Sequence, residues 1–191
     1  MVLGKRKPGK STSLLNKKLL FFFLKLFALV IIWECGYCFI LQPARVPDKQ
    51  LTNIITSGVT KCMNLFSPSS STYTWVRYAG KEYDADYIYK NGKAAFIIAD
   101  TCNGLSLMAI YVGFIILMPY PIKRKIVFAV SGVIVLTIAN IIRCGLLYWI
   151  YRRHPGMFEF NHHYLFTILM YLLIFYGWIL FTKGGKFNEA R

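Results

Sequence analysis

Long apolar stretches with few charges restrict the fold of this chain more than any other feature of its sequence. The hydrocarbon core of a bilayer is roughly 30 Å thick, and a helix needs about 20 apolar residues to cross it. Three stretches meet that length, and a fourth is shorter but suits a locally thinned bilayer. In chain order, the four predicted spans are residues 19–41, 105–119, 126–150 and 164–181.

The composition agrees with this interpretation, because 56% of the 191 residues are hydrophobic and the mean hydropathy is positive. A basic stretch precedes the first span, as in a secretory signal peptide. The apolar run of 19–41 nevertheless exceeds the roughly 7–15 residues of a signal core, and no small-x-small cleavage site follows it. We therefore expect a retained signal anchor and an all-α integral membrane protein with about four transmembrane helices, in contact with the lipid bilayer.

The net charge of +15 would suit a nucleic-acid-binding protein, but the cations cluster where membrane topology explains them. Cytoplasmic loops of membrane proteins carry an excess of Lys and Arg. The clusters are Lys5, Arg6, Lys7, Lys10, Lys17 and Lys18 before the first span, Lys123, Arg124 and Lys125 after the second, and Lys183 and Lys186 after the fourth. We expect no nucleic-acid partner, both termini in the cytoplasm, and a multi-pass protein of the cytoplasmic (inner) membrane.

The segment between the first two spans is the only sizeable part outside the membrane. Residues 46–66 carry apolar side chains at helical spacing, which predicts an amphipathic helix. "TWVRYAG" and "YDADYIYKNGKAAFIIAD" alternate in the manner of strands, and Asn91-Gly92 is typical of a β-hairpin turn. A small extracytoplasmic α/β insert, consisting of this helix and a β-hairpin, is therefore predicted between spans one and two.

These patterns divide the chain into five parts. They are a basic cytoplasmic N-terminus (1–18), the first span (19–41), an extracytoplasmic segment (42–101), a catalytic core with spans two to four (102–182) and a cytoplasmic tail (183–191).

Three chemically capable side chains are predicted to reach the same depth in the membrane. Cys102 and Arg143 each lie 17 residues from the ends of the predicted cytoplasmic turn, and His163 lies 19 residues before Thr182. At 1.5 Å per residue, Cys102 and Arg143 lie roughly 25 Å above the inner boundary, and His163 lies at nearly the same level. Depth therefore favours His163 over its neighbour His162, and the three spans converge at the outer interface.

Each residue also has a purely structural interpretation. A cysteine in an apolar protein is commonly an inert small hydrophobe. Arg143 can snorkel to the headgroups or form an ion pair with Asp100 or Glu159, since an unpaired cation inside a span is costly. His162 and His163 can be ordinary interfacial side chains.

A functional interpretation uses all of them together. A helix N-terminus and a nearby guanidinium both favour the thiolate of Cys102, which is the nucleophilic form. A histidine supplies the general base and then the acid, while Arg143 stabilises the thiolate or a developing oxyanion.

Three neighbours are predicted to support these residues. Asn103, like Asp100 or Thr101, can cap the helix that follows Cys102. Gly104 leaves room for the backbone of a substrate, and Asn140 shares the helix face of Arg143.

The motifs "TCNGLSLM", "NIIRCGLLY" and "FNHHYLF", in this order on successive spans, resemble the exosortase/archaeosortase family. The resemblance covers residues 100 to 182 and implies a membrane-embedded cysteine peptidase or transpeptidase that needs no cofactor. The family's Cys, Arg and His fall on Cys102, Arg143 and one of His162 or His163. The implied substrates are exported proteins whose C-terminal signal has a short motif, a membrane helix and a basic tail. Cleavage proceeds through a thioester, with transfer to water or to a cell-surface acceptor.

Two alternatives belong to other classes of protein. Cys35 and Cys38 form a Cys-x-x-Cys pair near the outer end of the first span, which is compatible with a quinone-linked thiol-disulfide oxidoreductase in which Cys62 and Cys102 form a second pair. A non-enzymatic membrane assembly factor is the other alternative. The three histidines lack accompanying acidic or thiolate ligands, so no metal site is predicted.

Overall fold

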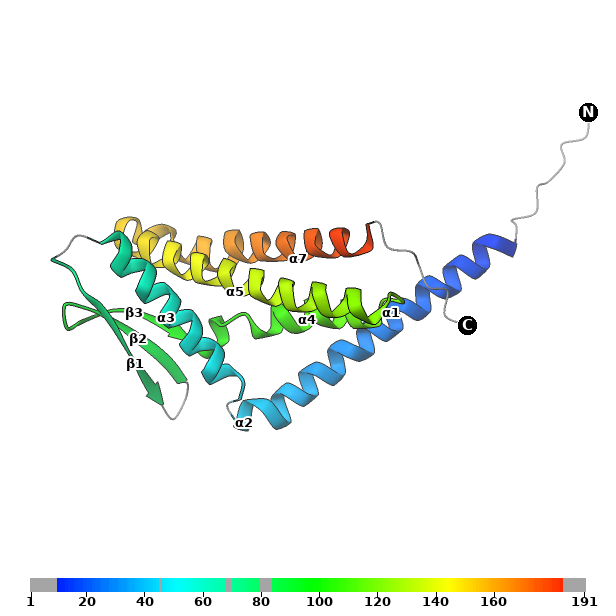
Figure 1. Ribbon diagram of the computed structural model, residues 1–191, viewed down its shortest axis with the longest axis horizontal. Coiled ribbons are helices and arrows are strands. Elements are labelled where there is room, and N and C mark those ends of the chain that lie inside the picture. Colours follow the sequence, from blue (N-terminus) through cyan, green and yellow to red (C-terminus); the bar gives the residue numbers. More distant parts are fainter. Residues whose placement is uncertain (1–9, 45, 68–69, 80–83, 184–191) are drawn as a thin grey trace, which may run out of the picture.

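The computed structural model describes residues 10–44, 46–67, 70–79 and 84–183, and it is mostly helical (Figure 1). The long helices form one body, and a helix with a small sheet lies at one end of it. The helices are α1 (Lys10–Gly36), α2 (Gln42–Ala44), α3 (Asp48–Phe66), α4 (Leu105–Leu117), α5 (Ile122–Arg153), α6 (Phe158–Phe160) and α7 (Phe166–Thr182). The strands are β1 (Tyr73–Ala79), β2 (Asp84–Lys90) and β3 (Lys93–Ala99).

Three helical stretches in the described part are long and apolar enough to cross a membrane, namely Leu24–Ala44, Ile122–Arg153 and Pro155–Thr182. Many of their large apolar side chains are exposed, as lipid contact requires. The last two extend beyond the predicted 126–150 and 164–181 at both ends. Apolar content alone set the predicted limits, whereas the helical backbone continues through the basic residues that flank each span.

The second predicted span, 105–119, corresponds to the short helix α4 of 13 residues. At 1.5 Å per residue α4 is about 20 Å long, well short of a full hydrocarbon core. It packs against both α5 and α7, and α1 packs against it from another side.

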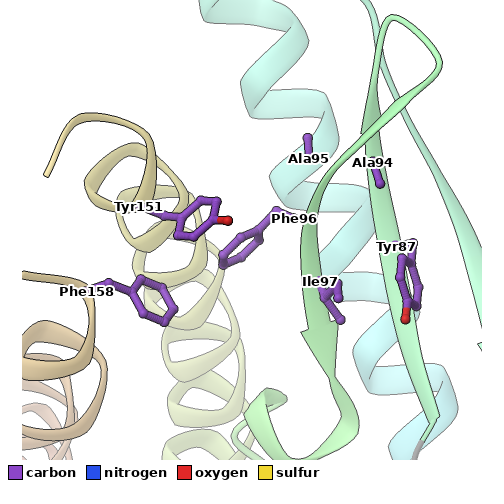
Figure 2. Close-up of a pocket in the computed structure, with 7 residues that line it drawn as sticks. All are labelled: Tyr87, Ala94, Ala95, Phe96, Ile97, Tyr151 and Phe158. Carbon is purple, nitrogen blue, oxygen red and sulfur yellow. The ribbon is translucent and has the colours of Figure 1, made fainter. Parts of the chain in front are cut away.

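The segment between α1 and α4 folds as α3 packed on a three-stranded antiparallel sheet of order β1-β2-β3. Residues 91 and 92 form a tight turn with φ of 50° and 76°, which brings Lys90 opposite Lys93. The predicted hairpin is therefore present, and β1 extends it to three strands. Ile88 and Ile98 pack with α3 and with the C-terminal part of α5, while the ring of Phe96 points toward Tyr151 and Phe158 (Figure 2).

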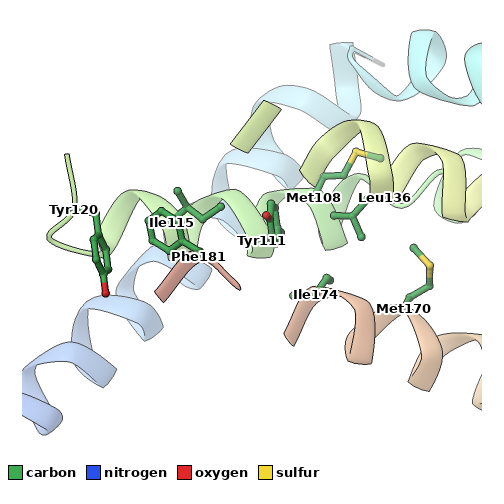
Figure 3. Packing of buried hydrophobic residues seen from close by; sticks show 8 residues of the cluster. All are labelled: Met108, Tyr111, Ile115, Tyr120, Leu136, Met170, Ile174 and Phe181. Carbon is green, nitrogen blue, oxygen red and sulfur yellow. The ribbon is translucent and has the colours of Figure 1, made fainter. Parts of the chain in front are cut away.

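The core of the helical body centres on α4 (Figure 3). Tyr111 is 3% exposed, donates a hydrogen bond to the carbonyl of Phe128 and accepts one at its own carbonyl from Trp178. Its ring lies where a Cβ on Gly132 would come within 2.0 Å, so only glycine fits at that position of α5. This packing fixes α4 between α5 and α7 and so determines where the residues before α4 are placed.

Candidate active site

Cys102 lies in a short 3-10 turn, Asp100–Cys102, that connects β3 to α4. Gly104 adopts a φ of +79°, a left-handed conformation that costs side-chain-bearing residues energy. The side chain of Asn103 then accepts a hydrogen bond of 2.8 Å from the N–H of Leu105, the first residue of α4. Gly104 therefore occupies the N-cap position of α4, while Asn103, one residue earlier, binds the first N–H of the helix with its side chain, and Cys102 precedes the helix by three residues.

Two polar side chains of α5 hold the backbone of Cys102. Asn140 donates from Nδ2 to the carbonyl oxygen of Cys102 at 3.0 Å, and Arg143 donates from its guanidinium to the same oxygen at 2.9 Å. Irregular backbone at membrane depth is tolerated only where such partners satisfy it. Asn140 and Arg143 therefore lie beside Cys102, and both act on its backbone.

His162 is the histidine that contacts the thiol. Its Nε2 lies 3.7 Å from Sγ of Cys102, and its ring stacks on Phe158 with a centroid distance of 5.5 Å. His162 belongs to a π-helical turn, Asn161–Leu165, inserted before α7. Such turns are frequent at functional sites because they rotate side chains away from regular helical positions.

His163 points elsewhere, contrary to what its depth favoured. Its side chain is 61% exposed, and its Nε2 lies 3.1 Å from the carboxylate of Glu159. Adjacent helical residues differ little in depth but by about 100° in direction. Direction is the property that separates the two imidazoles here.

Asp100 does not pair with Arg143, as the sequence allowed, but with Arg77 of β1. The Arg77 guanidinium donates to both Asp100 oxygens at 2.8 and 2.7 Å and to Asp86 at 3.1 Å. Thr52 of α3 adds a 2.6 Å hydrogen bond to Asp100. Asp100 and then Asp86 raise the pKa of Arg77 above its ordinary value, so the guanidinium stays charged.

This network was missed by sequence reasoning and ties the turn that carries Cys102 to the sheet. Asn103 connects the same turn to α3, because its Nδ2 donates to the buried carboxylate of Asp48 at 2.7 Å. One signal for the network was available: Arg77 shares its strand face with Tyr73 and Trp75, so it faces inward and requires a buried partner.

Two cavities flank the Cys102 turn. One of about 50 Å³ is lined by Cys102, Arg143 and His162 together with apolar side chains of β3 and α5. The other, of about 110 Å³, is more polar and includes Asp48, Asp100 and, again, Arg143. The smaller cavity gathers the thiol, the imidazole and the guanidinium around one space.

The remaining cysteines form no disulfide bond with one another or with Cys102 in this structure. All five cysteines are free thiols; Cys35, Cys38 and Cys62 are exposed, and Cys144 is buried. Cys102 contacts an imidazole rather than Cys62.

These observations define a multi-pass, mostly helical membrane protein in which a thiol and an imidazole meet at the end of a short central helix. A family profile described as transmembrane exosortase matches residues 14–184. The chain belongs to the transmembrane exosortase family, as the resemblance of its motifs indicated. No curated protein and no solved structure matches the chain significantly.

Replacing Gly104 with alanine should destabilise the site. A Cβ there would meet Asn140 only at ordinary van der Waals distance, 3.5 Å, so the cost comes from the left-handed backbone. We expect a loss of about 1–2 kcal/mol of unfolding free energy and a lower midpoint in thermal unfolding of the detergent-solubilised protein. Gly145→Ala on α5, where nothing lies within 4 Å, is the matched control and should leave the midpoint unchanged or higher. Equal midpoints for the two variants would contradict this account.

Proposed function

We propose that this protein is a membrane-embedded cysteine peptidase or transpeptidase that removes C-terminal sorting signals from exported proteins. The observation that carries the proposal is the 3.7 Å contact of Cys102 Sγ with His162 Nε2, in a cavity that Arg143 also lines. Membership of the transmembrane exosortase family supports the same substrate class.

The reaction begins with transfer of the Cys102 proton to Nε2 of His162, which leaves a thiolate. The thiolate attacks the scissile carbonyl carbon, and the C–N bond breaks as His162 returns the proton to the leaving amine. This step releases the C-terminal segment and leaves the rest of the substrate as a thioester on Cys102. Water, or an amine of a cell-surface acceptor, then attacks the thioester carbonyl; His162 accepts its proton and passes it to the departing sulfur.

Arg143 has two roles in the proposed reaction. Its terminal nitrogen holds the Cys102 carbonyl, and its Nε is buried without a hydrogen-bond partner in the described part of the chain. A charged donor beside the cavity stabilises negative charge on the thiolate or on the tetrahedral oxyanion. His163 has no direct role, and Asn140 and Asn103 position the turn.

The proposed topology has four spans, with α4 as the short second one. The clusters of Lys and Arg support a cytoplasmic location for both termini and for the 120–125 turn. The α3–sheet insert and Cys102 are then extracytoplasmic, at the outer side of the cytoplasmic (inner) membrane. A scissile bond just outside a substrate's membrane helix would meet Cys102 at this level.

The test uses membranes that contain the full-length chain and a reporter ending in a C-terminal motif, a membrane helix and a basic tail, taken from an exported protein of the producing organism. Wild-type chain should shorten the reporter, and Cys102→Ala should leave it intact while retaining normal insertion. Cys144→Ala, which removes the neighbouring buried thiol, is the matched control and should retain processing. Continued processing by the Cys102→Ala variant would refute the assignment.

A further inference from the structure

An open groove of about 370 Å³ runs along the outer edge of the sheet beside β3. Its walls come from β3, the outer end of α5 and the first residue of α6, and Figure 2 shows Phe96 between them. The groove shares Phe96, Ile97 and Phe158 with the small cavity that holds Cys102. The groove therefore adjoins the candidate active site.

The residues that line this groove come from both faces of β3. Ile98 and Phe96 pair with Asp86 and Ile88 on the face that packs on α3, whereas Ile97 pairs with Tyr87 on the opposite face. A groove lined by Phe96 together with Ile97 and Tyr87 consequently follows the strand edge. Side chains of successive strand residues point to opposite faces, and both sets reach this groove because it follows the edge of β3, where the register shifts and Ala95 has no partner on β2.

The edge of β3 offers backbone groups for pairing. The strand order is β1-β2-β3, so β3 has a neighbour on one side only. Among the described residues, no backbone group outside the sheet bonds to residues 93–99. Exposed edges of this kind bind extended peptides by adding a strand.

We propose that the substrate segment just before the scissile bond binds as a fourth strand, parallel to β3, in this groove; this proposal rests on the proposed function. β3 runs from Lys93 toward Cys102, and the acyl part of the substrate must also end at Cys102. Both chains therefore run in the same direction. The six residues from Ala94 to Ala99 span ~20 Å at ~3.3 Å per residue, which accommodates about six substrate residues.

The groove can be filled without touching the catalytic groups. Ala94 lies in the groove and is exposed, and across the sheet it is in register with Tyr89 and then Thr74 on the far edge. Ala94→Trp should lower reporter processing by about tenfold or more, because the substrate is displaced from Cys102. Thr74→Trp places the same ring on the same row of the opposite edge and should process the reporter at the wild-type rate.

Alkylation of Cys102 by iodoacetamide separates this proposal from the proposed function. The Ala94→Trp variant should be alkylated as fast as wild type, which shows that the thiol and its surroundings are intact. Equal processing by the two tryptophan variants, with a wild-type chain that does process, would overturn strand addition and leave the peptidase assignment standing. Processing that persists in Cys102→Ala would overturn the assignment itself.

Photo-crosslinking gives a second measurement that does not depend on turnover. Ile97 and Val76 are both exposed and lie on one row of the sheet, at the β3 and β1 edges respectively. In the Cys102→Ala background, a benzoylphenylalanine at position 97 should crosslink to the reporter and one at position 76 should not. Crosslinks of equal yield at both positions would contradict edge binding.

A proline scan of the reporter distinguishes strand pairing from docking by side chains alone. In a strand, only every second residue donates its N–H to a given neighbour, and proline has no N–H to donate. Substitutions over the six residues before the scissile bond should therefore slow processing at alternate positions. Uniform tolerance, or sensitivity without a period of two, would overturn the strand.

Discussion

Replacing His162 with alanine is expected to lower the rate of reporter processing by about 10²–10⁴-fold, the usual contribution of a general acid–base group. The reason is geometric, because Nε2 of His162 is the imidazole nitrogen that contacts Sγ of Cys102. The measurement is the initial rate of signal removal in membranes with equal amounts of inserted chain. His162→Gln should be equally slow, since an amide can occupy the space but cannot carry the proton.

His163→Ala is the matched control for this experiment. Its side chain is 61% exposed; its ring meets the His162 ring at a centroid distance of 4.7 Å, and its Nε2 pairs with the exposed Glu159. Exposed pairs of this kind contribute little, so we expect a rate within about twofold of wild type. A large loss at His163 with little at His162 would reverse the assignment, and equal losses would show that neither residue acts through the contact seen in the structure.

Replacing Arg77 with methionine is expected to produce the largest loss of stability. The guanidinium holds Asp100 through two hydrogen bonds and Asp86 through a third, and the Asp86 side chain is fully buried. Removing one partner of a buried pair typically costs about 3–5 kcal/mol, because the other charge remains buried without compensation. The midpoint of thermal unfolding in detergent should fall, and processing should fall with it because the Cys102 turn loses its connection to the sheet.

Two further variants make this prediction specific. Arg77→Lys keeps the charge but cannot bind a carboxylate with two parallel hydrogen bonds, so it should recover part of the lost stability. Arg152→Met removes an exposed arginine at the end of α5 and should change the unfolding free energy by at most about 0.5 kcal/mol. An Arg77→Met variant as stable as Arg152→Met would show that the network does not hold the turn.

The sequence predicted how far along their helices the site residues lie better than it predicted the directions of their side chains. Counting residues along two antiparallel spans brings Cys102 level with Arg143, and the structure has a 2.9 Å hydrogen bond between them. The same count could not separate His162 from His163, because their directions depend on a π-helical turn that leaves no apolar periodicity. Sequence reasoning assigned Gly104 to substrate access, which stays a prediction, and it did not foresee the left-handed backbone at this residue.

The partner of Asp100 could not be predicted for a different reason. Local spacing placed Asp100 near Arg143, but Arg77 arrives from a strand more than twenty residues earlier through the register of the sheet. The turn at Asn91 and Gly92 was predictable, since its geometry depends on two adjacent residues. Which edge of the sheet faces α5 depends on tertiary packing, which a single sequence does not specify.

Under the proposed function, the continuation of α5 beyond Arg143 sets a minimum length for the substrate linker that precedes the scissile bond. Arg143 is level with Cys102, and α5 extends about ten residues further, to Arg153, a rise of ~15 Å. Under the proposed function, a folded substrate domain that stops at the end of α5 would stand off from Cys102 by this rise. Crossing ~15 Å in extended form takes about five residues. Under the proposed function, an exported substrate is therefore expected to need about five extended residues between its last folded residue and the scissile bond. Shortening this linker should abolish release of the substrate while leaving its folded domain intact.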